Sequence, residues 1–210
     1  MKKFNRFIIY ILGIFILALG GVLAIKSNLG ASPVSSLPLS ISRVSNLSLG
    51  TAATMLFTVY VVIQIILLRK NFKVVQLLQI VFAVLFGQIM NLFNSVININ
   101  ANNIYIKLFI CVASFFITAL GVFLTITANI VPVAPDGLTQ IISLKNNIDF
   151  GKAKIYFDCV VVILSILILL LNGKNLDGMG IGTILSAILV GRIVFFINTY
   201  FKSSLEKIIF

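Results

Sequence analysis

The sequence predicts an all-α integral membrane protein with six transmembrane helices, arranged as two repeats of three helices each. Three observations support this prediction. The chain is 60% hydrophobic and only 10% charged, its apolar residues fall into six separate runs, and its two halves resemble each other. A soluble domain of 210 residues would need many more polar side chains to cover its surface.

Each apolar run is about 20 residues long, which lets a helix rising 1.5 Å per residue cross a hydrocarbon core of about 30 Å. The basic segment before the first run is similar to the start of a signal peptide, but this run is longer than a signal h-region and lacks an Ala-x-Ala cleavage site. We therefore expect a single membrane domain over residues 1–210. The predicted spans are Phe7–Ser27, Gly50–Leu68, Val74–Ile97, Ile104–Ala128, Lys152–Leu171 and Met179–Phe201.

The net charge of +11 does not indicate a nucleic-acid partner, because the basic residues form no stripe and no exposed aromatic residues lie between them. They fall between the spans instead. Most of the 16 lysines and arginines lie on the side of the N-terminus, which predicts a multi-pass protein with both termini in the cytoplasm. The residues on this side are Lys2, Lys3, Arg6, Arg69, Lys70, Lys73, Lys145, Lys152, Lys154, Lys202 and Lys207.

The two halves align without a gap over their first two spans, at an offset of 101 residues, and their third spans align at an offset of 104. The first repeat covers residues 4–98 and the second covers residues 105–202. Because each repeat holds an odd number of spans, the second must enter the membrane from the opposite side. Inverted repeats of this kind are typical of transporters. The informative identities are at Phe15, Ala18, Gly20, Asn28, Ser42, Asn46, Gly50 and Ala52.

Each repeat has a Pro/Gly-containing segment after its first span, at residues 31–46 and 132–147. Both segments are long enough for a helix that crosses half the membrane. They would line a transport pathway as re-entrant or broken helices, or lie on the interface as amphipathic helices without a site. If their N-termini point inward, free N–H groups would favour an anionic or polar group at the centre. The candidate pathway residues here are Ser32, Ser35, Ser36, Asp136 and Gly137.

The start of the first short helix stays open at this point. Ser32 before Pro33 suits an N-cap followed by a first-turn proline, but Pro38 would disturb a helix that begins there. A start at Ser35 or Ser36 is the alternative. In the second segment, Asp136 is expected to cap a short helix.

Three polar residues within the predicted spans are further candidates for a functional role. Arg192 lies near the centre of the sixth span, and Gln88 is its counterpart in the third. A charge in lipid is costly, so Arg192 should face a partner or a water-filled cavity. We expect Arg192 and Gln88 to line a pathway together, or Arg192 to form a structural ion pair with Asp158. Asp158 is the one acid within a span and also a candidate for proton coupling.

The run Asn28-Leu29-Gly30-Ala31-Ser32-Pro33, the later Leu47-Ser48-Leu49-Gly50-Thr51 and Pro135-Asp136-Gly137 resemble the YczE/YitT-like family of small bacterial integral membrane proteins. The resemblance covers most of the chain, although Val34 stands where an aromatic residue is expected after the proline. It implies the bacterial inner membrane and this topology, but no substrate.

Catalysis is not expected, because the chain has no histidine and only five acidic residues, too few for acid–base or metal chemistry. We expect no cofactor and no metal. The leading functional prediction is a secondary transporter or channel-like permease for a small polar or anionic solute. The alternative is a non-transporting membrane scaffold that supports or regulates another membrane complex. Beyond the lipid bilayer, a homo-oligomer and a partner membrane protein both stay open.

Overall fold

The computed structural model describes residues 2–99, 103–176 and 178–209. In this part of the chain every regular element is a helix. Short 3₁₀ turns at Arg69–Asn71 and Val74–Leu77 join the second and third long helices. The long helices are α1 (Lys2–Lys26), α3 (Leu49–Leu68), α4 (Leu78–Val96), α5 (Ile104–Ala128), α7 (Phe150–Leu171) and α8 (Ile181–Ile209), and the short ones are α2 (Pro33–Ser45) and α6 (Ala134–Asn146).

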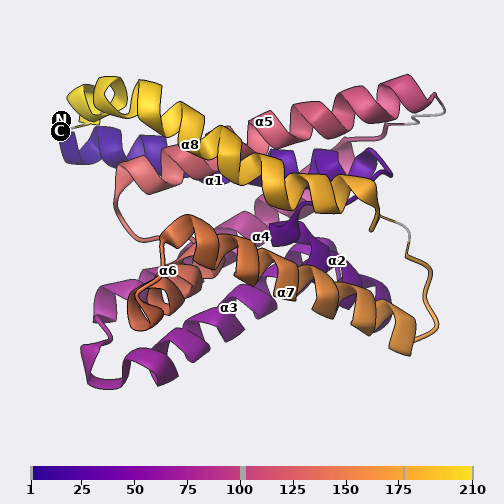
Figure 1. The fold of residues 1–210 in the computed structure, drawn as a ribbon, viewed down its shortest axis with the longest axis horizontal. Coiled ribbons are helices and arrows are strands. Elements are labelled where there is room, and N and C mark those ends of the chain that lie inside the picture. Colours follow the sequence, from indigo (N-terminus) through magenta and orange to yellow (C-terminus); the bar gives the residue numbers. More distant parts are fainter. Residues whose placement is uncertain (1, 100–102, 177, 210) are drawn as a thin grey trace.

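Six helices in the described chain are long and apolar enough to cross a membrane, which confirms the six predicted spans. Three of them, α3, α5 and α7, both begin and end within two residues of the prediction, because hydropathy largely decides where such helices run. The third span differs, since it opens with the 3₁₀ turn at Val74–Leu77 and becomes α-helical at Leu78. Both chain termini lie at the same end of the molecule (Figure 1), as an even number of spans requires.

The first helices of the two halves, α1 and α5, cross at two glycines. A Cβ atom at Gly20 would collide with Thr118, and one at Gly121 would collide with the backbone of Leu17. Gly20 aligns with Gly121, and Leu17 aligns with Thr118, so the two contacts are reciprocal. Glycine at both positions lets the helix backbones approach closely.

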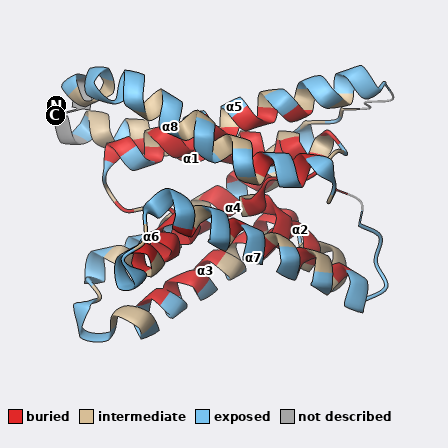
Figure 2. Ribbon diagram, viewed as in Figure 1, coloured by how far each residue is buried: buried red, intermediate tan, exposed pale blue. Residues whose placement is uncertain are grey.

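The short helices pack inside the bundle, each against both halves. Helix α2 contacts α3 of its own half and α7 of the other, and α6 contacts α7 of its own half and α3 of the other. Each short helix has 13 residues, about 20 Å at 1.5 Å per residue. Their N-terminal halves are buried, and Figure 2 shows buried residues gathered where the helices cross at the centre. This burial fits inserted broken segments better than helices lying on the interface.

Matching asparagines end the corresponding helices of the two halves. Asn28 and Asn129 follow α1 and α5, whereas Asn46 and Asn147 end α2 and α6, and all four have φ between 49° and 57°. Asparagine tolerates this left-handed conformation better than most residues, and it commonly terminates helices. The requirement for positive φ explains why asparagines recur at these positions.

Beyond α2 and α6, the same loop contact occurs twice. The Ser42 hydroxyl donates to the Leu47 carbonyl over 2.6 Å, and the Ser143 hydroxyl donates to the Ile148 carbonyl over 2.7 Å. The donors and acceptors are related by the offset of 101 residues. The sequence similarity between the halves therefore extends to their local hydrogen bonding.

Two predictions about the short helices need correction. Helix α2 begins at Pro33 with Ser32 as the N-cap residue, and Pro38 lies inside it, so the alternative start at Ser35 or Ser36 is wrong. Pro38 cannot donate a backbone hydrogen bond, and it is buried with most of the first half of α2. In α6 the N-cap residue is Val133. Asp136 is therefore not the cap, and its carboxylate is free to point toward α7.

Candidate functional site

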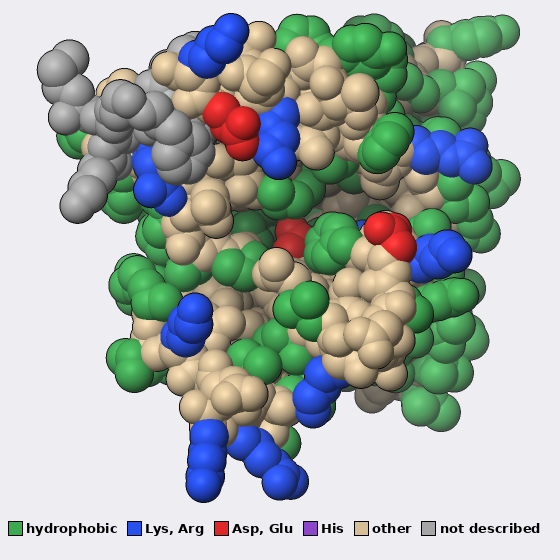
Figure 3. All heavy atoms as spheres, turned by 60° about the vertical axis from the view of Figure 1, so that its left-hand side comes forward, with side chains coloured by type: hydrophobic (Ala, Val, Ile, Leu, Met, Phe, Trp, Pro, Cys, Tyr) green, Lys and Arg blue, Asp and Glu red, His purple; other side chains and the backbone are tan. Residues whose placement is uncertain are grey.

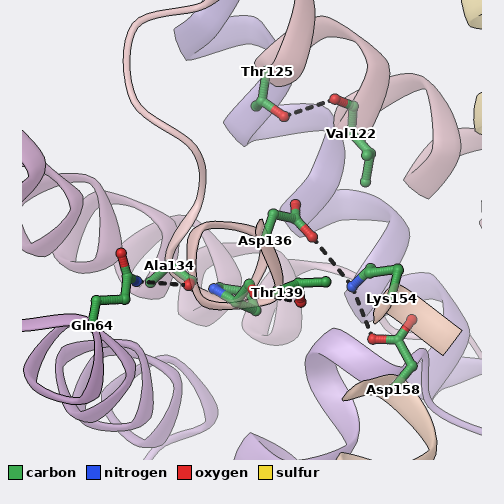
Figure 4. A network of polar contacts seen from close by, with 9 residues as sticks. Gln64, Val122, Thr125, Ala134, Asp136, Thr139, Lys154 and Asp158 are labelled. Carbon is green, nitrogen blue, oxygen red and sulfur yellow. Dashed lines mark hydrogen bonds and ion pairs between the residues drawn. The ribbon is translucent and has the colours of Figure 1, made fainter. Parts of the chain in front are cut away.

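A buried cluster of three charged side chains joins α6 to α7. The ammonium group of Lys154 donates a hydrogen bond of 2.8 Å to Asp158, one turn further along α7, and lies 3.2 Å from Asp136 in the first turn of α6. Asp136 is 4% exposed and Asp158 is 6% exposed. Figure 4 shows the lysine between the two carboxylates. We refer to Asp136, Lys154 and Asp158 as the charged cluster.

The charged cluster is held in place by aromatic side chains. Lys154 lies 5.8 Å from the centre of the Phe157 ring, close enough for a cation–π interaction. Phe157 packs edge-on against Tyr60 of α3, with ring centres 5.5 Å apart. Figure 3, which brings the end with both termini forward, shows an acidic side chain in a hollow at the centre of this face, with Lys and Arg side chains around its edge.

An amide pair fixes the start of α6. Gln64 of α3 and Gln79 of α4 exchange two hydrogen bonds of 2.9 and 3.0 Å, and Gln64 also donates to the Ala134 carbonyl over 3.0 Å. Both glutamines are at most 1% exposed. A Cβ atom at Gly137 would lie 3.1 Å from the side-chain oxygen of each glutamine, so a glycine lets α6 sit tightly on this pair.

Serine hydroxyls hold the start of α2 in place. The Ser36 and Ser165 hydroxyls are 3.1 Å apart and hydrogen-bonded, linking α2 to α7. Ser32 and Ser35 bond to each other through their hydroxyls over 2.8 Å. All four side chains are at most 2% exposed, so three predicted pathway serines lie together in the interior.

A hollow of about 770 Å³ opens among α2, α3 and α4, at the end of the molecule away from the termini. Its polar lining consists of amides and hydroxyls, including Gln88, Asn91 and Ser42. Asn91 is fixed, because its side-chain oxygen accepts a 2.7 Å hydrogen bond from the Gly50 amide. Lys26 donates to the backbone carbonyl of Asn94 at the rim over 3.0 Å. The hollow therefore offers hydrogen-bonding groups of both kinds.

A comparison with known protein families finds a match. The family model of DUF6198, described as a family of unknown function, matches residues 4–199. The chain belongs to this family. No curated protein and no solved structure matches it. The resemblance to YczE/YitT-like proteins stays a prediction, because the matching family carries a different name.

In this DUF6198 protein the predicted pair of Arg192 and Gln88 is not brought together. Gln88 lines the hollow beside α2 and α3, whereas Arg192 occupies an exposed position on α8 and does not line it. The predicted ion pair between Arg192 and Asp158 is replaced by the contact of Asp158 with Lys154. The two other predicted residues that meet are Asp136 and Asp158, through the lysine between them.

Four polar residues of the site were missed by the sequence reasoning. Lys154 is expected to be one more basic residue on the cytoplasmic side, yet it lies in the second turn of α7 and is partly buried against two acids. Its spacing of four residues from Asp158 was the available signal, since such pairs share a helix face. Gln64, Gln79 and Ser165 each stand in an apolar run, and polar residues within a membrane span usually face the interior.

Proposed function

We propose that this protein is a secondary transporter for a small polar solute, in which the two repeats are inverted relative to each other. The observation that carries the proposal is the exchange of short helices between halves: α2 packs on α7 and α6 packs on α3. In transporters with inverted repeats, broken helices meet near the membrane midplane and form the solute site there. The buried N-terminal turns of α2 and α6 suit this role.

The reciprocal contacts support an inverted arrangement. Gly20 with Thr118, and Gly121 with Leu17, are the contacts that a two-fold axis between α1 and α5 would generate. Three spans in each half would place this axis in the membrane plane. Rocking of one half against the other about the crossing of α1 and α5 would then open the interior to each side in turn.

The proposed orientation follows from charge. The end that carries both termini also carries the loops with Arg69, Lys70, Lys73, Lys145 and Lys152. Basic loops remain on the cytoplasmic side of a membrane. We therefore propose that both termini lie in the cytoplasm of a bacterial cell, whose inner membrane the sequence resemblance implies, and that the hollow with Gln88 faces the opposite side.

A neutral polar solute fits the hollow better than an anionic one. Its polar groups are amides and hydroxyls, which both donate and accept hydrogen bonds. The anionic alternative relied on the N-termini of the short helices and on Arg192, and Arg192 occupies an exposed position on α8 outside the hollow. The substrate class we propose is thus a small uncharged molecule with several hydrogen-bonding groups.

The test is the accessibility of single cysteines in membrane vesicles of both orientations, with Cys111 and Cys159 replaced by alanine. Cysteines at Ser36, Gln88 and Gly137 should react with an impermeant thiol reagent, and at least one of them should react from both sides of the membrane. Ile184→Cys is the matched control, because Ile184 is 62% exposed on the apolar surface of α8 and should face lipid. It should not react from either side.

A second measurement addresses the substrate. Small neutral polar solutes that bind should raise the thermal midpoint of the detergent-purified protein, because ligand binding stabilises the folded state. Gln88→Ala should remove that stabilisation, whereas Gln140→Ala, at an exposed amide of α6 outside the hollow, should retain it.

The cysteine experiment decides between the two functions. If every interior cysteine reacts from one side at most, the scaffold alternative becomes the better explanation.

A further inference from the structure

Three cations gather where the chain turns from α3 into α4. The two candidate spans that meet here, Leu49–Asn71 and Val74–Val96, are separated by only two residues. Arg69, Lys70 and Lys73 lie at this turn, and all three are exposed. A connection this short cannot extend far from the bilayer, so once the two helices cross a membrane the cations lie at the level of the lipid headgroups. We refer to Arg69, Lys70 and Lys73 as the basic corner.

No acidic side chain of the described residues forms an ion pair with the basic corner. The chain has no aspartate or glutamate before Asp136, and the ion pairs of the described residues are formed by Lys154 and Lys202. Figure 1 places the turn between α3 and α4 at the lowest part of the view, and Lys and Arg side chains project from the lowest part of Figure 3. The basic corner therefore offers positive charge to a ligand.

Exposed apolar side chains follow the basic corner directly. Val74 is 77% exposed and Val75 is 52% exposed, at the start of the third span. The turn itself is fixed, because Phe72 packs against the hydrophobic core and the backbone amide of Lys73 donates to the side-chain oxygen of Gln76 over 3.1 Å. Cations next to exposed apolar side chains bind anionic lipids through the headgroup and the acyl chain together. The corner and the two valines provide both contacts on a fixed backbone.

Arg69 provides an independent observation, because its backbone adopts φ 48° and ψ −117°. Positive φ is unfavourable for most residues, and glycine and asparagine tolerate it best. The other non-glycine residues of the described chain with positive φ are Asn28, Asn46, Asn129 and Asn147. An arginine at such a position gives up backbone stability, and its exposed side chain forms no ion pair within the described residues. This points to a use of the side chain outside the protein.

We infer that the basic corner, together with Val74 and Val75, is a binding site for an anionic phospholipid. The cations bind the phosphate of the headgroup, and the valines contact the first part of an acyl chain. A zwitterionic phospholipid carries the same phosphate, but its headgroup also has a cationic group that the corner repels. A soluble phosphate ion has no acyl chain for the valines. Net negative charge on a lipid is therefore what the corner selects, and this inference does not depend on the proposed function.

Fluorescence quenching by brominated phospholipids tests the inference, because the chain contains no tryptophan and one can be introduced as the only reporter. Val74→Trp places it beside the basic corner, and Val96→Trp places it at the other end of α4, where the residue is 68% exposed. The full-length protein is studied in vesicles of phosphatidylglycerol and phosphatidylcholine, with bromine on the acyl chains of one lipid at a time. Quenching then measures which lipid lies beside the tryptophan.

The reporter beside the corner should detect mainly the anionic lipid. Val74→Trp should show a preference for phosphatidylglycerol of at least about fivefold, the effect of one cation near an anionic surface. Added salt should reduce this preference, because salt screens exposed charges. Val96→Trp should show a smaller preference, since the basic corner lies at the opposite end of α4.

Charge variants in the Val74→Trp background assign the preference to the basic corner. Replacing all three cations of the corner by glutamine should abolish it. The matched control is Lys145→Gln with Lys152→Gln, which removes two exposed cations outside the corner and should retain it. Arg69→Gly separates binding from folding. It should weaken the preference while the thermal midpoint in a neutral detergent stays unchanged or rises, because glycine accepts positive φ.

Several outcomes would overturn the inference. An equal preference at Val74→Trp and Val96→Trp, or none at either, would contradict a local lipid site, and so would a preference that survives loss of the three cations. An equal loss in the control variant would assign the selection to the overall charge of this surface. A lower thermal midpoint with an unchanged preference in Arg69→Gly would make the arginine structural only. If the triple variant does not fold, an unchanged preference in Lys70→Gln with Lys73→Gln still contradicts the inference.

Discussion

Ser36 and Ser165 are hydrogen-bonded across the two halves, with their hydroxyl oxygens 3.1 Å apart. At the offset of the repeat, Ser36 corresponds to Gly137 and Ser165 corresponds to Gln64. Gln64 in turn lies against Gly137 and bonds to the first residue of α6. Equivalent positions thus anchor each short helix to the second long helix of the opposite half, with different side chains.

This relationship predicts that α2 can be covalently locked to α7. In a background with Cys111 and Cys159 replaced by alanine, Ser36→Cys with Ser165→Cys should form a disulfide on mild oxidation, because the two side chains are already in contact. Loss of both free thiols, restored by a reductant, is the measurement. Ser36→Cys with Ser114→Cys, on α5, is the control pair and should stay reduced. Thiols that remain free in the first pair would contradict the packing of α2 on α7.

Replacing glycine by alanine at equivalent positions in the third long helices of the two repeats should have different effects on stability. A Cβ atom at Gly87 of α4 would collide with the backbone of Gly50, whereas at its counterpart Gly191 of α8 no atom lies within 4 Å. Gly87→Ala should therefore destabilise the protein by about 1–3 kcal/mol, as overpacking typically does. Gly191→Ala should leave the thermal midpoint in detergent unchanged or raise it. Equal effects of the two substitutions would argue against the different packing of α4 and α8.

Hydropathy predicted the six spans, and the positions of glycine and proline predicted the two short helices. Bilayer thickness determines the length of a span, and backbone geometry determines where a helix breaks, so both can be recognised locally in the sequence. Side-chain partnerships depend on how helices face one another, and composition does not contain that information. Arg192 and Gln88 occupy matching places in the repeat, yet α8 leaves its arginine exposed while α4 turns its glutamine toward the hollow.

Lys154 shows the limit of counting charges. A lysine at the beginning of a span normally reaches for the membrane surface, and only the spacing of four residues between Lys154 and Asp158 points to an interior position. Two acids, one from α6 and one from α7, hold it in the interior. Only the fold of α6 onto α7 brings Asp136 to that place.

Removal of Lys154 should strongly destabilise the protein. Lys154→Met leaves two buried carboxylates without their shared cation, a change on the order of 3–5 kcal/mol when one partner of a buried ion pair is lost. Thermal or denaturant unfolding in detergent measures the effect, and Lys152→Met, at an exposed position, is the matched control. Adding Asp136→Asn and Asp158→Asn to Lys154→Met should recover much of the loss. A triple variant no more stable than Lys154→Met would show that the lysine acts through packing and not through charge.

The amide pair of Gln64 and Gln79 should behave as one energetic unit. Gln64→Leu removes two reciprocal hydrogen bonds and the bond to the Ala134 carbonyl, and it leaves buried polar groups without partners, which costs about 1–3 kcal/mol. Gln79→Leu removes the same two reciprocal hydrogen bonds and leaves the Gln64 amide without this partner. The double variant should therefore lose less stability than the two single losses added together, which a double-mutant cycle of unfolding free energies measures. Additive losses would mean that the two glutamines stabilise α6 separately, and that the start of this helix is not held by their mutual pairing.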